Sequence, residues 1–301
     1  MAEFPQWHIL GAGSIGGLWA ARLQQAGRTP TLILQEDAYA DYQQQGGLII
    51  DDEGLAAVTA TTAKRLNSAI KYLVVCCKAH QTIDALSTLV TRLHKECVIV
   101  LVQNGMGTDE KVRRLFPHNR ILCGTTTNGA YRTQRFHIVP AGVGETHIGS
   151  LDHIDASTQA LITSLSCPDF EVQHTQAILP LLWRKLAISC VVNPLTVRYQ
   201  CLNGGLLEIP RARADVAAMC EEMLSVSRAL GRESGIEDLE KIVLCVVQQT
   251  ANNRSSMLQD NQAGRTTEIE SINGYLCQLA AANNIAAPLN KALYQEISSL
   301  K

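Results

Sequence analysis

A glycine-rich turn near the start of the chain constrains its fold more than any other feature. It follows a short apolar run at 8–10, precedes an amphipathic segment at 14–26, and reads Gly11-Ala12-Gly13-Ser14-Ile15-Gly16. A strand, a G-x-G-x-x-G turn and a helix in this order are typical of a dinucleotide-binding βαβ unit. The first glycine permits the tight turn, the second lets a pyrophosphate approach the backbone, and the third permits close helix–strand packing.

The first part of the chain continues to alternate short apolar runs with amphipathic ones, which indicates a parallel sheet covered by helices. We expect strands at 8–10, 31–34, 72–77, 98–102 and 121–126, and helices at 14–26, 81–93 and 108–115. Two more strand-like runs, at 135–139 and 145–149, are separated by the turn residues Pro140-Ala-Gly142. This last pair predicts a hairpin added to the parallel core.

The pattern changes near Gln176, after which helical periodicity dominates. We expect the main amphipathic helices at 215–230, 239–251, 268–283 and 290–300. The predicted fold is therefore α/β, with an N-terminal Rossmann-type dinucleotide-binding domain over 1–175. An all-α C-terminal domain is predicted over 176–301.

Composition limits the partners of such a chain. The formal net charge is −2, so attraction to nucleic acid or to an anionic membrane surface is not expected. The longest apolar runs, at 98–102 and 242–247, are too short to span a bilayer, and residues 1–5 lack the pattern of a secretory signal. The ten cysteines are scattered without metal-ligand spacing. We expect a cytoplasmic protein with reduced thiols and no metal site.

A polar stripe stands out within the apolar run at 183–194. Lys185, Ser189 and Asn193 recur at every fourth position, which places them on one helix face. An isolated lysine on a helix is more often a surface residue whose charge reaches water. Here the amide two turns further on and Pro194, which can kink the helix or expose carbonyls, favour a substrate site.

Two further segments carry candidate polar groups. Thr267 and Glu270 fit a capping box, which would place Glu268 at the first position of a helix. Glu268 then either only stabilises the helix start or orients Lys185 and accepts a substrate hydroxyl. Asn104 directly follows an apolar run, where it either contacts nicotinamide ribose or substrate or simply forms an Asn-Gly turn.

The end of the second expected strand normally distinguishes NAD from NADP, because an acid there binds the ribose and a base binds the 2′-phosphate. This chain reads Leu34-Gln35-Glu36-Asp37, without an arginine. Glu36 could bind the ribose or only begin the next helix, and Lys78 is the best candidate cation. The residues therefore leave the choice between the two cofactors open.

Taken together, the motifs resemble those of the ketopantoate reductase (2-dehydropantoate 2-reductase) family, and the resemblance runs through most of the chain. The segments that carry it are G-A-G-S-I-G, V-C-C-K-A-H-Q, V-Q-N-G-M-G-T, W-R-K-L-A-I-S-C-V-V-N-P-L-T, S-S-M-L-Q-D and R-T-T-E-I-E-S-I-N-G-Y-L. The resemblance implies reduction of 2-dehydropantoate to (R)-pantoate with NADPH, a step toward pantothenate and coenzyme A.

The resemblance also implies roles for individual residues. Lys185 would be the general acid, with Glu268 beside it positioning the substrate. The substrate-binding positions would be Asn104, Lys185, Ser189, Asn193, Asn203, Asn253, Ser256 and Glu268. The cofactor-binding positions would be Gly11, Ala12, Gly13, Ser14, Ile15, Gly16, Lys78, Asn104 and Ala130.

Two departures from the family pattern bear on specificity. Ser189 stands where the family commonly has asparagine, which leaves open a related branched 2-oxo acid as substrate. Gln35 replaces the family's usual arginine, so NAD(H) stays an alternative to NADP(H). A non-catalytic NADP(H)-binding sensor is a third hypothesis, against which Lys185, Asn193 and Glu268 argue. The sequence is compatible with a monomer or a homodimer.

Overall fold

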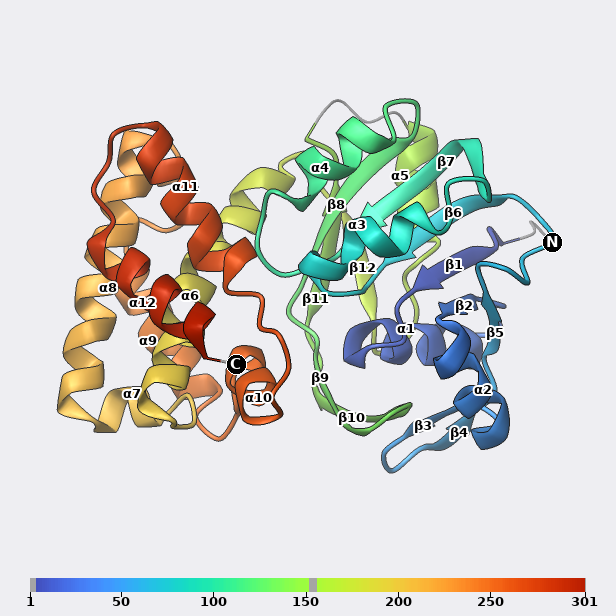
Figure 1. The fold of residues 1–301 in the computed structure, drawn as a ribbon, viewed down its shortest axis with the longest axis horizontal. Coiled ribbons are helices and arrows are strands. Elements are labelled where there is room, and N and C mark those ends of the chain that lie inside the picture. The colour runs from blue at the N-terminus through green and yellow to red at the C-terminus, as the bar shows by residue number, and fades with distance from the viewer. Residues whose placement is uncertain (1–3, 152–155, 301) are drawn as a thin grey trace. The chain divides into compact units, whose positions relative to one another are not determined.

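The computed structural model describes residues 4–151 and 156–300. The chain forms two compact units (Figure 1). One comprises Met1–Gln103 and Thr108–Ile178, and the other comprises Asn104–Gly107 and Leu179–Lys301. The short segment Asn104–Gly107 thus belongs to the second unit although it lies within the sequence of the first.

The first unit is built on an eight-stranded sheet with the order β12-β11-β8-β7-β6-β1-β2-β5. Its strands are β1 (Trp7–Leu10), β2 (Thr31–Leu34), β5 (Thr59–Thr62), β6 (Ile70–Val75), β7 (Leu93–Leu101), β8 (Arg120–Thr126), β11 (Glu145–Gly149) and β12 (Glu171–His174). In this order, every strand from β8 through β7, β6, β1 and β2 to β5 is parallel to its neighbours, whereas β11 is antiparallel to β8. The predicted Rossmann-type sheet is confirmed.

The apolar runs of this sheet are buried on both faces. Along β6, Val74 faces one core while Leu73 and Val75 face the other, as the two-residue period of a strand requires. Helices accompany the strands: α1 (Ser14–Gln25), α2 (Glu36–Gln45), α3 (Ala79–Ser87), α4 (Thr108–Leu115) and α5 (Ala156–Thr163). Gly27 follows α1 with φ of +73°, the left-handed conformation expected of a glycine after a helix.

A second, four-stranded sheet has the order β4-β3-β10-β9. Its strands are β3 (Leu48–Ile50), β4 (Gly54–Ala56), β9 (Gly129–Gln134) and β10 (His137–Gly142). The predicted hairpin of 135–139 with 145–149 is therefore wrong, because β10 pairs with β9 and β3 while β11 pairs with β8. The reason is packing on α1: a Cβ at Gly17 would lie 2.3 Å from Ile138 Cδ1, so β10 covers this helix closely.

The second unit is helical, as predicted. Its elements are α6 (Ile178–Tyr199), α7 (Gly205–Glu208), α8 (Pro210–Ala229), α9 (Leu239–Gln249), α10 (Ser256–Gln262), the π-helical turn η1 (Glu270–Gly274), α11 (Tyr275–Ala282) and α12 (Pro288–Ser299). Its core includes Trp183 and Val191 of α6, Met223 of α8 and Leu293 of α12.

Helix α6 is long and apolar enough to cross a membrane, the one such helix among residues 4–151 and 156–300. Half of its most apolar window is buried inside the protein. Length and composition alone are weak grounds for a membrane span, since the central helix of a helical core has the same properties. Because α6 contributes Trp183, Leu186 and Val191 to that core, we interpret it as the central helix of the second unit.

Candidate functional site

The glycine turn after β1 shows three different spatial requirements. Gly11 has φ of +102°, and a Cβ there would lie 2.8 Å from the Cys77 backbone nitrogen. A Cβ at Gly16 would lie 2.2 Å from the Gly11 carbonyl oxygen, so α1 packs too closely for any side chain. At Gly13 the nearest atom to a Cβ is 3.9 Å away, and the first turn of α1 carries no acidic residue. The turn thus leaves room where an anionic pyrophosphate would approach the helix.

Lys78 lies at the same edge of the sheet, three residues after β6. The strands β1 and β6 are parallel with Leu10 opposite Val75, so the chain after each strand emerges at the carboxyl edge. Lys78 is the residue immediately before α3, and its side chain is half-buried. Its position next to the glycine turn suits a cation that faces a bound dinucleotide.

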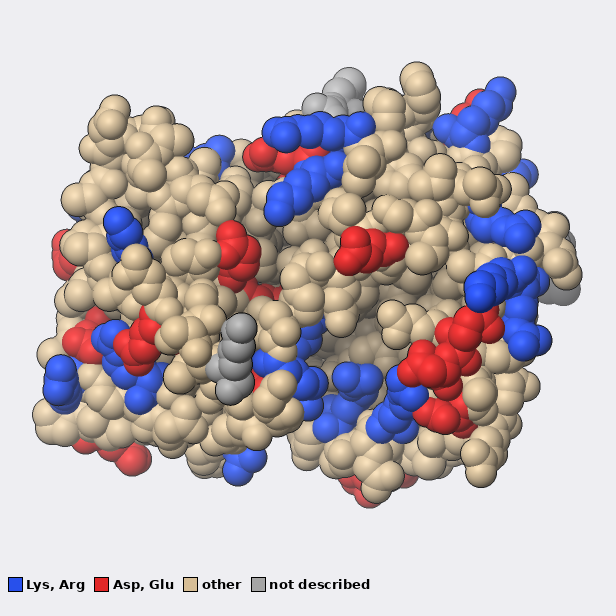
Figure 2. Space-filling view, in the orientation of Figure 1, with Lys and Arg blue, Asp and Glu red and all other residues tan. Residues whose placement is uncertain are grey.

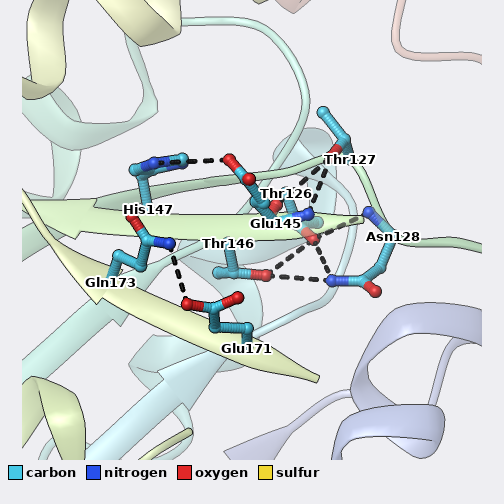
Figure 3. A network of polar contacts seen from close by, with 8 residues as sticks. All are labelled: Thr126, Thr127, Asn128, Glu145, Thr146, His147, Glu171 and Gln173. Carbon is cyan, nitrogen blue, oxygen red and sulfur yellow. Dashed lines mark hydrogen bonds and ion pairs between the residues drawn. The ribbon is translucent and has the colours of Figure 1, made fainter. Parts of the chain in front are cut away.

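A buried polar network braces the end of β8 (Figure 3). Asn128 donates from Nδ2 to the hydroxyl oxygens of Thr126 and Thr146, at 3.1 Å and 3.2 Å, and accepts from the Gly144 amide at 3.0 Å. Thr146 also donates to Thr126 at 2.8 Å. The network ties the end of β8 to β11 just before Ala130, which lies in β9 opposite Pro140.

In the second unit, α6 brings the predicted stripe together. Lys185, Ser189 and Asn193 follow one another along one face, and each is half-buried. Burial lowers the pKa of the Lys185 ammonium from 10.5 to about 8, while the negative charge of Glu268 opposes that shift. An ammonium with this pKa is protonated near neutral pH and is a much stronger acid than an exposed lysine.

Glu268 is held by the segment that follows β7. Its Oε2 accepts a hydrogen bond of 2.9 Å from Asn104 Nδ2, and its side chain is buried. The Ser271 hydroxyl donates to the Asn104 and Glu268 carbonyl oxygens, at 3.3 Å and 3.1 Å. Gly105 has φ of +81°, and a Cβ there would lie 2.2 Å from the Ser271 carbonyl oxygen. The Asn-Gly pair is therefore a close-packed contact that positions Asn104 against Glu268.

The predicted capping box at Thr267 is wrong. Thr267 Oγ1 accepts from the Ile269 amide at 3.4 Å, but Glu270 does not reach back to the start of the helix. Its carboxylate instead accepts from the Tyr294 hydroxyl and from Gln278 Nε2. Glu268 consequently precedes the π-helical turn η1 rather than beginning an α-helix.

Pro194, directly after the stripe, removes one backbone hydrogen bond of α6 at Cys190, which lies between Ser189 and Asn193. The carbonyl of Cys190 would normally accept from the amide four residues later, but proline has no N–H. Asn273 supplies the missing donor, because its Nδ2 lies 2.9 Å from the Cys190 carbonyl oxygen. Asn273 is fully buried and also donates to Asn290 Oδ1 at 2.8 Å. This side chain fixes the part of α6 between Ser189 and Asn193.

The remaining candidates cluster around the start of α10. Asn203 is buried. Its backbone N–H donates to the Asn253 carbonyl oxygen at 3.0 Å, and its side-chain Nδ2 donates to Thr250 Oγ1 at 2.9 Å. Asn203 Oδ1 is buried and makes no hydrogen bond within the described residues. Asn253 and Ser256 are exposed, whereas the adjacent Ser255 caps α10 by accepting from the Leu258 amide. Polar groups for a small oxygenated ligand are thus present.

Sequence reasoning missed three residues that brace these groups: Asn128, Ser271 and Asn273. Each forms hydrogen bonds to partners distant in sequence, so no local pattern identified them. Asn273 alone had a signal, since a proline inside a helix requires some donor for the freed carbonyl. Asp260 of α10 forms an ion pair with Arg265, with 3.0 Å between Oδ1 and Nε.

Comparison with known protein families gives two matches that cover most of the chain. The family described as ketopantoate reductase PanE/ApbA matches residues 7–153, and its C-terminal family matches residues 177–301. Among curated proteins, the 2-dehydropantoate 2-reductase of Shigella flexneri is 35% identical over 292 residues, 96% of this chain and 93% of that protein.

Solved structures agree on the fold. The probable 2-dehydropantoate 2-reductase of Bacillus subtilis superposes with a TM-score of 0.82 at 29% identity, covering 99% of this chain and 100% of that one. A D-mandelate dehydrogenase in complex with NADH and anilino(oxo)acetate gives a TM-score of 0.91 at 20% identity, covering 98% and 97% of the two chains.

Proposed function

Because this chain belongs to the ketopantoate reductase family, we propose that it reduces 2-dehydropantoate to (R)-pantoate, with NADPH as the reductant. The observation that carries the proposal is the Lys185 ammonium, whose pKa is lowered to about 8 in the neighbourhood of the buried Glu268 carboxylate. The reaction would serve pantothenate and coenzyme A biosynthesis, in the cytoplasm.

The nicotinamide, when bound in its reduced form, supplies a hydride to the ketone carbon. Negative charge then develops on the ketone oxygen, which becomes an alkoxide. The Lys185 ammonium stabilises this charge through a hydrogen bond and transfers its proton to the oxygen, which gives the secondary alcohol. The lowered pKa of Lys185 makes that proton transfer easier than it would be from an exposed lysine.

Glu268 keeps Lys185 charged, since its carboxylate raises the pKa that burial lowers. Asn104 fixes the orientation of that carboxylate through its 2.9 Å hydrogen bond. We therefore propose that Glu268 is the second catalytic residue beside Lys185, and that its carboxylate also accepts a hydrogen bond from a substrate hydroxyl. Ser189, Asn193, Asn203, Asn253 and Ser256 are the proposed contacts to the remaining oxygens of the substrate.

The dinucleotide would be held by the turn Gly11–Gly16, with its pyrophosphate at the open side of Gly13. Lys78, Asn104 and Ala130 are the further proposed contacts. The fit of the glycine turn supports this assignment, because Gly11 and Gly16 have no space for a side chain while Gly13 does.

Ser189 supports a second candidate, a reductase for another 2-oxo acid. A hydroxyl is shorter than the amide usual at this position and leaves more room for the substrate. The D-mandelate dehydrogenase with the similar fold was solved with anilino(oxo)acetate, which carries an aryl group.

A steady-state comparison separates the two candidates. We expect the purified protein to oxidise NADPH with ketopantoate at a higher kcat/KM than with 2-oxoisovalerate or phenylglyoxylate. A clear preference for either of the other acids would favour the second candidate. Absence of turnover with all three acids, in a protein that binds NADPH, would favour the non-catalytic sensor.

A further inference from the structure

The loops that follow β2 and β5 lie side by side at the edge of the sheet that carries the glycine turn. The strands β2 and β5 are parallel, with Leu34 opposite Thr62, so Gln35 and the residues after Thr62 emerge next to each other. On its other side β2 pairs with β1, which leads into the glycine turn. The adenosine ribose of a dinucleotide bound at that turn lies near the end of the second strand. The exit of β5 is therefore its neighbour.

Arg65 projects from the exit of β5 onto the first turns of α2. Its Nε lies 3.9 Å from Glu36 Oε2, and its Cζ lies 4.9 Å from the ring centroid of Tyr39. The Arg65 side chain is 60% exposed and that of Glu36 is 45% exposed. A contact this long and this exposed is weak, so a stronger anion can replace Glu36 as the partner of the guanidinium. Stacking on Tyr39 keeps the guanidinium in place.

The other arginine of this region is already engaged. Arg135, in the turn between β9 and β10, bonds Asp37 at 2.8 Å and also bonds Asp41. The Arg135 guanidinium lowers the pKa of the Asp37 carboxyl and pairs with two of the three acids of α2, Asp37 and Asp41. In Figure 2 the acidic side chains over α2 are flanked by basic ones. Asp37 and Asp41 are thus paired with Arg135, whereas Arg65 has only its long contact with Glu36 among the acids of α2, so Arg65 is the better candidate to receive a phosphate.

We propose that Arg65 binds the 2′-phosphate of NADPH, in place of an arginine directly after β2, where this chain has Gln35. The planar guanidinium can donate two parallel hydrogen bonds to a phosphate, whereas its contact with Glu36 is a single long one. Lys64, the exposed neighbour of Arg65, adds positive charge to the same loop. The inference rests on the proposed function only in requiring that a nicotinamide dinucleotide binds at the glycine turn.

The test is a calorimetric titration of the full-length protein with four ligands: NADPH, NADH, 2′-phospho-ADP-ribose and ADP-ribose. We expect Arg65→Gln to weaken the binding of NADPH and 2′-phospho-ADP-ribose by about 10- to 100-fold, the usual effect of losing a charged hydrogen bond. The affinities for NADH and ADP-ribose should not change, and Arg65→Lys should restore part of the loss. ADP-ribose and its 2′-phosphate cannot transfer hydride, so the readout is independent of turnover.

Arg114→Gln is the matched control, because Arg114 lies in α4 and is also an exposed arginine 3.9 Å from a glutamate, Glu110. It should leave all four affinities unchanged. Glu36→Gln should leave NADPH binding unchanged or tighten it, since it removes the competing anion.

Three results would overturn the inference: equal loss of binding of all four ligands in Arg65→Gln, no loss of binding of the two ligands with a 2′-phosphate, or weaker NADPH binding in Glu36→Gln. The last would mean that Glu36 helps to bind the dinucleotide and does not compete with it for Arg65. These outcomes are distinguishable from failure of the proposed function. A protein that binds NADPH through Arg65 but reduces no 2-oxo acid would refute only the function.

Discussion

Asn273 provides the sharpest test of how the second unit holds its central helix. Replacing it by alanine leaves the Cys190 carbonyl buried without a donor, because Pro194 cannot bond it. The same change removes the donor to Asn290 Oδ1. A buried polar group without a partner costs about 1–3 kcal/mol, so we expect Asn273→Ala to destabilise α6 by about 2 kcal/mol.

The cost should depend on the proline. In a Pro194→Ala background the restored backbone N–H can bond the Cys190 carbonyl through the helix itself. Asn273→Ala should then cost only the bond to Asn290, about 1 kcal/mol. The two changes are therefore expected to couple by at least about 1 kcal/mol, within the range for groups that share a partner.

Hydrogen exchange of peptides from α6, read by mass spectrometry, reports the stability of this helix without treating both units as one transition. A loss of about 2 kcal/mol corresponds to exchange about 30-fold faster in Asn273→Ala. Asn283→Ala is the control, because Asn283 Nδ2 also donates to a helix carbonyl, that of Leu279, which already accepts from the Asn283 amide.

That control should exchange like the parent protein. Asn273→Ala could instead accelerate exchange equally in the parent protein and in the Pro194→Ala background. Its effect on α6 would then not come from the Cys190 carbonyl that Pro194 leaves without a backbone donor.

Four further predictions concern the proposed reaction, the cofactor and the glycine turn. Lys185→Ala should lower kcat by about 10²–10⁴-fold, and near-parental turnover would remove Lys185 from the mechanism. Activity should decline as the pH rises through about 8, because the proton donor is then lost, and Glu268→Gln should move this decline to lower pH in a kcat–pH profile, since Glu268 raises the Lys185 pKa. Gly13→Val should keep the circular dichroism spectrum, since a side chain fits there, but it should lose dinucleotide binding in titrations, because that side chain would occupy the space through which the pyrophosphate approaches. Gly16→Val should fail to fold, because its Cβ would lie 2.2 Å from a carbonyl oxygen; a folded Gly16→Val protein would contradict this close packing.

Local patterns were sufficient for some of the elements that position the candidate site. The helix expected at 108–115 is α4 with the same bounds, and the apolar run at 31–34 is β2. The stripe on α6 also follows directly from the helical period. In each case, a single element's own periodicity determines which face its side chains share.

Pairing over long distances could not be predicted in this way. Alternation of apolar and polar residues marks β10 as a strand but does not say that it pairs with β9 and β3 rather than with β11. Likewise, Asn104 and Glu268 are 164 positions apart, and neither sequence segment indicates the other as its partner. The capping box failed for the same reason, because Tyr294 competes for the Glu270 carboxylate.

The assignment of Asn104–Gly107 to the helical unit means that this unit is not one continuous piece of polypeptide. A gene fragment beginning at residue 179 would encode every helix from 179 onward but would omit the loop that is packed against Ser271. Such a fragment would lack Asn104, so the Glu268 carboxylate would lose the hydrogen bond that it accepts from the Asn104 side chain. Engineering that aims to exchange helical halves between relatives must therefore transplant both stretches together.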